Sequence, residues 1–225
     1  MNEAQEAGDV GDGFFVVFEG IDGSGTTTQI ERYAAHLREK RRPVHVTREP
    51  SNGPVGTMIR LVLTQRIALP RTHQAEAMAL LFAADRLDHV ASEIDPLLRD
   101  GYVVLSDRYD LSSLAYQSTT SADNAESIAW IRELNRHARR PDLTLVLDVS
   151  PDVAAARRRA RGGAAELFDD AELQARLADA YRRAEDFVPG DRVVHLDGDQ
   201  DLATVQAQIA AALDPIVSSR LPGVR

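Results

Sequence analysis

Apolar runs of strand length alternate along the chain with longer stretches that have the periodicity of helices. Five such runs occur, at residues 14–19, 43–47, 102–106, 143–149 and 192–196. Three of them are nearly continuous in Val and Leu, which is the pattern of strands that are buried on both faces of a parallel sheet. The apolar pattern therefore predicts five parallel strands.

The stretches between these runs predict helices at residues 26–40, 55–63, 74–100 with a break near Asp88, 123–139, 151–161, 171–187 and 202–213. Alternation of strands and helices predicts an α/β fold with a doubly wound five-stranded parallel sheet and helices on both faces. We expect one domain over residues 14–213, and flexible ends at residues 1–12 and 217–225.

The turn between the first strand and the first helix is rich in glycine and fits the phosphate-binding loop of the P-loop NTPases at every position but one. It reads Gly20-Ile21-Asp22-Gly23-Ser24-Gly25-Thr26-Thr27. Its glycines would point backbone N–H groups at a phosphate, and the N-terminus of the following helix adds partial positive charge. Thr26 stands where the pattern has a lysine for the β- and γ-phosphates, whereas Thr27 keeps the hydroxyl that binds Mg²⁺. The loop thus predicts nucleotide binding and leaves turnover open, and a glycine-rich turn without a ligand is the alternative.

The second and third apolar runs also end in charged residues, in Thr47-Arg48-Glu49-Pro50 and Ser106-Asp107-Arg108-Tyr109. Ligands of an open parallel sheet bind beyond the carboxyl ends of its strands. Arg48 and Arg108 therefore predict bidentate contacts to a second phosphate, and Asp107 predicts a carboxylate that reaches Mg²⁺ directly or through water. The first apolar run ends in a charged residue too, Glu19. Simple solvation of strand ends is the alternative, but it poorly explains why three strands all end in charged residues.

Composition narrows the class of protein. With 225 residues, 44% of them hydrophobic, the chain can bury a single large core. Its net charge of −9 argues against a general nucleic-acid or anionic-membrane surface, so that any phosphate site must be a local basic cluster. The absence of cysteine excludes disulfides and thiolate metal sites. No signal peptide and no apolar window of eighteen residues are present, so we expect a cytoplasmic protein.

Four stretches together resemble the bacterial thymidylate kinases of the nucleoside-monophosphate kinase group, from about residue 14 to about residue 213. They are residues 18–25, residues 47–50, Leu81-Phe82-Ala83-Ala84-Asp85-Arg86, and Asp107-Arg108-Tyr109 running on to Ser113 and Ala115-Tyr116-Gln117. The resemblance implies Mg²⁺-dependent transfer of the ATP γ-phosphoryl to dTMP, a short lid at about residues 157–171, and a homodimer formed through helices.

The resemblance also implies roles for single residues. Phe82 would stack on thymine, with Arg86 one helical turn further on at the base edge and Pro50 near the thymine methyl; a core position is the alternative for Phe82. The remaining roles are phosphate contacts from Arg48 and Arg108, acidic positions near the metal and the transferred phosphoryl at Asp22 and Asp107, a Tyr116 that disfavours ribonucleotides, and hydrogen bonds near the base from Ser113 and Gln117.

Two features depart from the family pattern. Thr26 replaces the loop lysine, and the segment after Gly162 lacks a further Asp-Arg pair. Residues 157–159 and 161 are arginines, and an arginine on a phosphoryl transition state is worth roughly 10³–10⁵ in rate. Arg157 and Arg161 share a helical face, while Arg158 and Arg159 are expected to point elsewhere. We therefore expect Arg157 or Arg161 to replace the lysine; a solvated basic helix end is the alternative.

The favoured function is thus a thymidylate kinase that uses ATP and Mg²⁺. One alternative is a kinase for another deoxynucleoside monophosphate, and another is a nucleotide-binding protein that has lost catalysis with its lysine. A GTPase switch is disfavoured because the chain has no Asn-Lys-x-Asp-type guanine motif, and a DNA-binding module is disfavoured by the acidic charge balance.

Overall fold

A computed structural model describes residues 13–70, 72–120, 124–162 and 170–220. Its strands are β1 (Phe14–Glu19), β2 (Val44–Arg48), β3 (Val103–Asp107), β4 (Leu143–Asp148) and β5 (Val193–Asp197). They form one sheet in the order β2-β3-β1-β4-β5, and every neighbouring pair is parallel. The predicted five-stranded parallel sheet is confirmed, with most strand ends shifted by one residue.

The helices follow the strands as expected, with differences in their bounds. They are α1 (Thr26–Glu39), α2 (Pro54–Leu63), α3 (Gln74–His89), the π-helical turn η1 (Val90–Ile94), α4 (Asp95–Arg99), α5 (Asp110–Thr120), α6 (Asn124–Leu134), α7 (Pro151–Arg161), α8 (Ala171–Tyr181), α9 (Ala184–Phe187) and α10 (Leu202–Arg220). The break predicted near Asp88 falls at Val90, and helix α5 has no counterpart among the predicted elements.

The C-terminal helix differs most from expectation. It continues through Pro215 to Arg220, and Val217 is buried in the core. The prediction of a flexible end is therefore wrong for residues 217–220, because Val217 extends the buried row that Val205, Ile209 and Leu213 begin. The predicted end at residues 1–12, residues 221–225 and residues 163–169 of the predicted lid lie outside the described residues.

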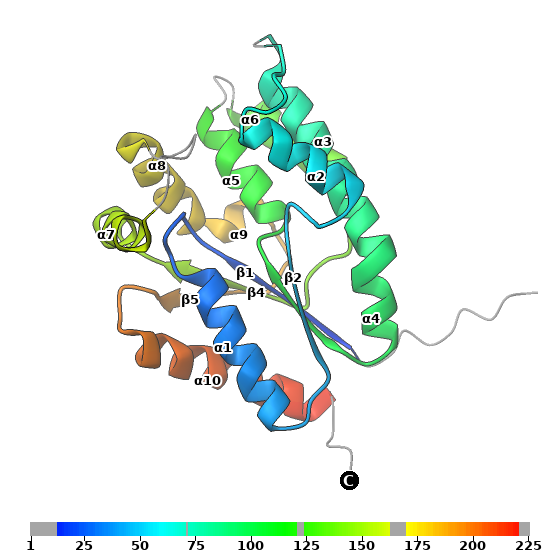
Figure 1. The fold of residues 1–225 in the computed structure, drawn as a ribbon, viewed down its shortest axis with the longest axis vertical. Helices are drawn as coiled ribbons and strands as arrows, with labels where there is room; N and C mark the ends of the chain where they lie inside the picture. Colours follow the sequence, from blue (N-terminus) through cyan, green and yellow to red (C-terminus); the bar gives the residue numbers. More distant parts are fainter. Residues whose placement is uncertain (1–12, 71, 121–123, 163–169, 221–225) are drawn as a thin grey trace, which may run out of the picture.

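Side chains of the central strand β1 alternate between two packed layers, which is why its six residues are all buried. Phe14, Val16 and Phe18 pack in a core with residues of α1 and α10, which lie side by side (Figure 1). Phe15 and Val17 pack in a second cluster with residues of η1 and α4. The strand is thereby fixed, and its carboxyl end presents the glycine-rich loop.

Candidate active site

The glycine-rich loop joins β1 to α1 and has a backbone that requires glycine. The φ angles are +90° at Gly23 and +96° at Gly25, in the left-handed region. A Cβ atom on Gly23 would lie 2.5 Å from the carbonyl oxygen of Ala154 in α7. The loop therefore lies directly against α7, and a larger residue at position 23 would push the two apart.

An open cleft of about 600 Å³ lies over this loop. Its lining comes from the loop itself, from Asp107 and Arg108 at the end of β3, from Arg157 and Arg158 on α7, and from residues that follow β5. Thr26 also lines the cleft but is only 8% exposed. The cleft brings together the strand-end residues that the sequence predicted at one edge.

Thr27 and Asp107 meet in this cleft, where the hydroxyl Oγ1 donates to Oδ2 of the carboxylate over 2.5 Å. The second carboxylate oxygen, Oδ1 of Asp107, is buried without a hydrogen-bond partner in the described residues. A hydroxyl beside a carboxylate with an unused oxygen is a donor set that suits Mg²⁺, which binds through one or two protein oxygens together with phosphates and water.

Arg108 crosses the cleft from the end of β3. Its guanidinium forms an ion pair with Asp22 and donates to the carbonyl of Gly20 over 3.1 Å. The hydroxyl of Tyr116 donates to the other oxygen of Asp22 over 3.0 Å, and the Tyr116 ring lies under the guanidinium. Burial lowers the pKa of Arg108, but Tyr116, Tyr181 and Asp22 raise it well above its ordinary value, so the charge is fixed.

Glu19, at the end of β1, shares two hydrogen-bond partners with Arg108. Its carboxylate is fully buried and accepts hydrogen bonds from the N–H of Tyr109 (2.8 Å) and the hydroxyls of Ser112 (2.6 Å) and Tyr181 (3.3 Å). Ser112 and Tyr181 also accept from Arg108. Burial raises the pKa of Glu19 to about 7, against the lowering effect of Arg108.

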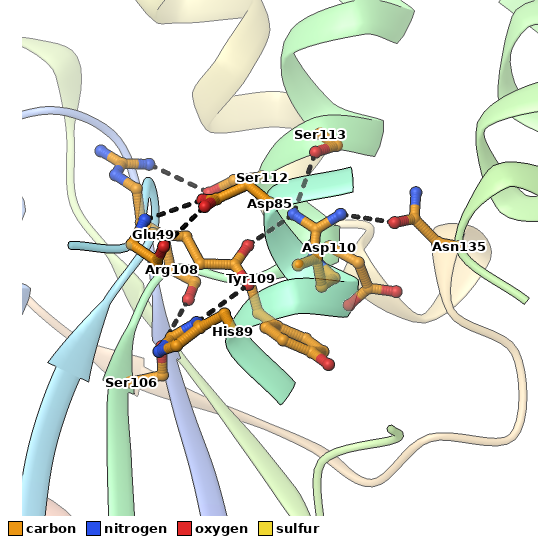
Figure 2. Close-up of polar contacts among 12 residues, drawn as sticks. Glu49, Asp85, His89, Ser106, Arg108, Tyr109, Asp110, Ser112, Ser113 and Asn135 are labelled. Carbon is orange, nitrogen blue, oxygen red and sulfur yellow. Dashed lines mark hydrogen bonds and ion pairs between the residues drawn. The ribbon is translucent and has the colours of Figure 1, made fainter. Parts of the chain in front are cut away.

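Arg86 lies on the other side of the site, in a buried polar network. It is 1% exposed, and its guanidinium donates to Glu49 Oε2 over 2.6 Å, to Asn135 Oδ1 over 2.5 Å and to Ser113 Oγ over 3.2 Å. Ser113 and Asn135 approach it from α5 and from the end of α6 (Figure 2). Burial lowers the pKa of Arg86, but the negative charges of Glu49 and Asp110 outweigh burial and raise it.

The remaining predicted contact residues differ in exposure. Phe82 is half-buried on α3, four residues before Arg86, and Pro50 is half-buried after the cis peptide bond from Glu49. Arg48 is exposed and pairs in register with Asp107, so both lie at the same sheet edge. The side chains of Gln117 and Arg161 lie outside the described residues.

Helix α7 contacts the glycine-rich loop through two adjacent arginines. Arg157 donates to the carbonyl of Ser24 over 3.1 Å, and Arg158 donates to the carbonyl of Asp22. The expectation that Arg158 points elsewhere is wrong, because the loop passes across the helix at Ala154 and lies within reach of both side chains. Helical spacing alone could not indicate this crossing.

Several residues of the site were not among the predicted ones. Glu19 and Glu49 were visible as charged strand ends, but their position alone indicated no role. Ser112 lies beside the predicted Ser113. Tyr181 is the last residue of α8 and Asn135 directly follows α6. Both lie far in the sequence from every motif, so no signal in the sequence marked them.

The sheet order, with a glycine-rich loop between β1 and α1, defines a P-loop NTPase of the α/β class. Comparison with known proteins gives the family. The family model for thymidylate kinase matches residues 18–209, and the chain belongs to the thymidylate kinase family.

Similar proteins cover most of the chain. A probable thymidylate kinase of Pyrococcus horikoshii is 38% identical, over 81% of this chain and 88% of its own. A probable thymidylate kinase of Pyrobaculum aerophilum is 41% identical, over 78% of this chain and 85% of its own. One of Thermococcus kodakarensis is 37% identical, over 90% of this chain and 98% of its own. These relatives support the family and do not show to which branch of it the chain belongs.

In the ranges that the structure describes, no helix is long and apolar enough to cross a membrane.

Proposed function

We propose that this chain is a thymidylate kinase that transfers the γ-phosphoryl group of ATP to dTMP, giving dTDP and ADP. The observation that carries the proposal is the meeting of the glycine-rich loop with the motif 107–109 at one sheet edge, where Thr27 contacts Asp107 over 2.5 Å and Arg108 pairs with Asp22. Membership of the thymidylate kinase family supports it.

Positioning and charge neutralisation would do most of the work in this transfer. An oxygen of the dTMP phosphate forms a bond to the γ-phosphorus, the bond from that phosphorus to the β–γ bridging oxygen breaks, and its electron pair leaves with ADP. The acceptor phosphate is already a competent nucleophile, so no strong base is required.

ATP would bind along residues 20–27, with its phosphates on the loop amides and the N-terminus of α1. Thr27 and Asp107 would hold Mg²⁺, which supplies positive charge to the phosphates when bound. The unused buried oxygen of Asp107 supports this assignment.

The acceptor would bind beyond Arg108, next to the cleft that the glycine-rich loop lines. Arg48 and Arg108 would hold the dTMP phosphate in line with ATP, and Asp22 would lie near the transferred group. The buried charge of Arg86, fixed by Glu49 and Asn135, is suited to a specific contact with the base edge, because a guanidinium held by partners loses little entropy on binding. The residues that would surround the nucleoside are Phe82, Arg86, Pro50, Ser113, Tyr116 and Gln117.

Arginines of the lid region, about residues 157–171, would offset the missing lysine. Losing one well-placed transition-state charge costs on the order of a hundred- to a thousand-fold in rate, and one arginine can restore that much. Arg157 and Arg161 are the candidates on sequence grounds, and Arg157 lies at the loop, where it donates to the carbonyl of Ser24.

The homodimer and the cellular location belong to the same proposal. Exposed apolar side chains on the neighbouring helices α2 and α3, which include Met58, Leu61, Leu80 and Leu87, would be covered by a second copy. A cytoplasmic location would give the enzyme access to ATP and dTMP.

Two other functions are open to the same experiment. Thr26 favours a nucleotide-binding protein without catalysis, and a kinase for another deoxynucleoside monophosphate is the second alternative. Steady-state ADP production would be measured with ATP and Mg²⁺ plus dTMP, dUMP, dCMP or no acceptor, beside a Thr26→Lys variant.

Turnover that depends on dTMP in the unaltered protein supports the thymidylate kinase. Turnover that is absent, and is restored by Thr26→Lys, would show a binding protein on a kinase scaffold. A higher kcat/KM for dUMP or dCMP than for dTMP would identify a different acceptor.

A further inference from the structure

The guanidinium of Arg108 contacts two hydroxyl groups that come from helices far apart in the sequence. Its Nη1 atom donates to the hydroxyl oxygen of Ser112 in α5 over 3.2 Å (Figure 2) and to that of Tyr181, the last residue of α8, over 3.1 Å. The two hydroxyl oxygens lie 2.9 Å apart. Helices α5 and α8 therefore hold Arg108 together, at the point where the chain leaves β3.

The buried carboxylate of Glu19 determines the direction of both hydroxyl groups. An ionised carboxylate only accepts hydrogen bonds, so the hydroxyl protons of Ser112 and Tyr181 point to Glu19 Oε2, over 2.6 and 3.3 Å. Each hydroxyl oxygen then turns its lone pairs to the guanidinium of Arg108. Burial and the charge of Glu19 raise the pKa of Tyr181 well above its ordinary value, so this hydroxyl keeps its proton.

The backbone of Arg108 also depends on its surroundings. Its φ angle is +74°, in the left-handed region that residues with a side chain rarely adopt. Such a conformation persists only where the surrounding structure enforces it, and such residues cluster at functional sites. The side chain is 22% exposed and lines the cleft, so the guanidinium that these contacts fix is accessible from the cleft.

Tyr181 belongs to this arrangement although no motif includes it. Its side chain is 2% exposed, and its ring lies in the same buried core as Leu114 and Leu177. A buried tyrosine hydroxyl needs hydrogen-bond partners, and those of Tyr181 include Arg108 and Glu19. The core fixes the ring, and the ring therefore holds its hydroxyl rigidly against the guanidinium.

We propose that Tyr181 is a positioning residue for the acceptor, whose hydroxyl holds the Arg108 guanidinium in the orientation that binds the phosphate of dTMP. The inference rests on the proposed function, in which Arg108 contacts this phosphate, and extends it to a residue outside every motif. A guanidinium recognises a phosphate through a planar array of donors, so its orientation decides the strength of the contact. Without the Tyr181 hydroxyl, the guanidinium would lose one of the acceptors that fix this plane.

The test compares the Kd values of dTMP and thymidine, measured by isothermal titration calorimetry at pH 8, for the wild type and Tyr181→Phe. This pH lies above the pKa of Glu19, which burial raises to about 7. Thymidine has the same base and sugar as dTMP but no phosphate. Tyr33→Phe is the matched control, because Tyr33 is also buried and its hydroxyl also donates to a carboxylate, that of Asp214, over 3.0 Å where α1 and α10 pack together.

We expect Tyr181→Phe to raise the Kd of dTMP about tenfold, and in any case more than about threefold, because a hydrogen bond to a charged group is lost. The Kd of thymidine and the KM for ATP should stay within about threefold of the wild type, and Tyr33→Phe should leave all three constants within about threefold. In an Arg108→Gln background, Tyr181→Phe should change the Kd of dTMP by less than about twofold, because Tyr181 acts through Arg108.

Circular dichroism and thermal unfolding verify the fold of each variant. Ser112→Ala removes the second hydroxyl and should cause the same selective loss of dTMP affinity, so it tests the inference even if Tyr181→Phe does not fold. The inference is wrong if Tyr181→Phe leaves the Kd of dTMP within about threefold, weakens dTMP and thymidine equally, has the same effect without Arg108, or is matched by Tyr33→Phe. A wild type that binds dTMP without turning it over overturns the proposed function alone, since the Kd values still test Tyr181. A wild type that binds no dTMP overturns both.

Discussion

The ion pair between Glu49 and Arg86 shows how burial decides what a charge pair is worth. Its partners are 2.6 Å apart and almost fully buried, while Glu133 and Arg136 are also 2.6 Å apart but 61% and 59% exposed. Removing one partner of a buried pair leaves an uncompensated charge, which costs about 3–5 kcal/mol, whereas an exposed pair contributes about 0–1 kcal/mol.

We therefore expect Glu49→Gln to lower the free energy of unfolding by about 3 kcal/mol or more, and Glu133→Gln to change it by less than about 0.5 kcal/mol. Urea denaturation at pH 7 measures both. Equal losses from the two variants would contradict the role of burial.

The ionisation of Glu19 should make the free energy of unfolding depend on pH. Burial raises its pKa from 4.5 to about 7, so between these values the folded protein keeps a proton that the unfolded chain releases. The wild type should lose stability relative to Glu19→Gln as pH rises from 4.5 to about 7, by on the order of 3 kcal/mol, and the difference should stay constant above that. Urea denaturation at pH 5, 6, 7 and 8 measures it, and parallel profiles of the two proteins would refute the shift.

Single residues of the site were predictable where a motif carried them. Asp107 and Arg108 could be placed beside the loop because parallel strands end at one edge. The contacts of Arg86 with Asn135 and Glu49 could not be predicted, because they join three elements whose mutual packing no local pattern encodes. The same is true of Arg158, whose direction depends on where the loop crosses α7.

At the scale of elements, α7 fixes the shape of the phosphate loop through its contact with Gly23. A Cβ atom at this glycine would lie 2.5 Å from the Ala154 carbonyl, whereas at Gly190 it would meet no heavy atom within 4 Å. Their φ angles are nearly equal, +90° and +94°. A side chain at Gly190 would therefore strain the backbone alone, whereas a side chain at Gly23 would strain the backbone and also displace α7.

Alanine at either position should lower stability by about 1 kcal/mol, since both require the left-handed region. Only Gly23→Ala should also reduce kcat/KM for ATP, by at least about tenfold, because a shift of about 1 Å in positioned groups can cost on the order of a hundredfold. Thermal unfolding and steady-state kinetics check the pair. Equal kcat/KM values for the two variants would show that the contact does not shape the loop.

The strands and most helices could be predicted because their apolar periods are strong. Helix α5 was missed, because its sequence is rich in Ser and Thr, which have weak helix propensity. Leu111, Leu114 and Ala115 are buried at helical spacing, so tertiary packing stabilises what local propensity does not. The end of α10 was missed because Pro215 suggests a helix end, yet Val217 is buried beyond it.

For the whole molecule, the distribution of apolar surface indicates where a second copy would bind. Leu80 and Met58 are 51% and 47% exposed on α3 and α2, two helices that pack together (Figure 1). Leu202 is 45% exposed at the start of α10, which lies on the far side of the sheet from α4. An acidic residue placed in a dimer interface would leave a buried charge without a partner, which interfaces do not tolerate.

We expect the wild type to elute with the mass of a dimer in size-exclusion chromatography with light scattering. The double variant Met58→Glu/Leu80→Glu should shift to the mass of a monomer at micromolar concentration, while Leu202→Glu should stay dimeric. Because neither Met58 nor Leu80 is buried within one chain, the monomer should keep its fold and its circular dichroism spectrum. If the double variant keeps the mass of a dimer, the interface lies on another face. If the wild type has the mass of a monomer, the proposed homodimer is wrong.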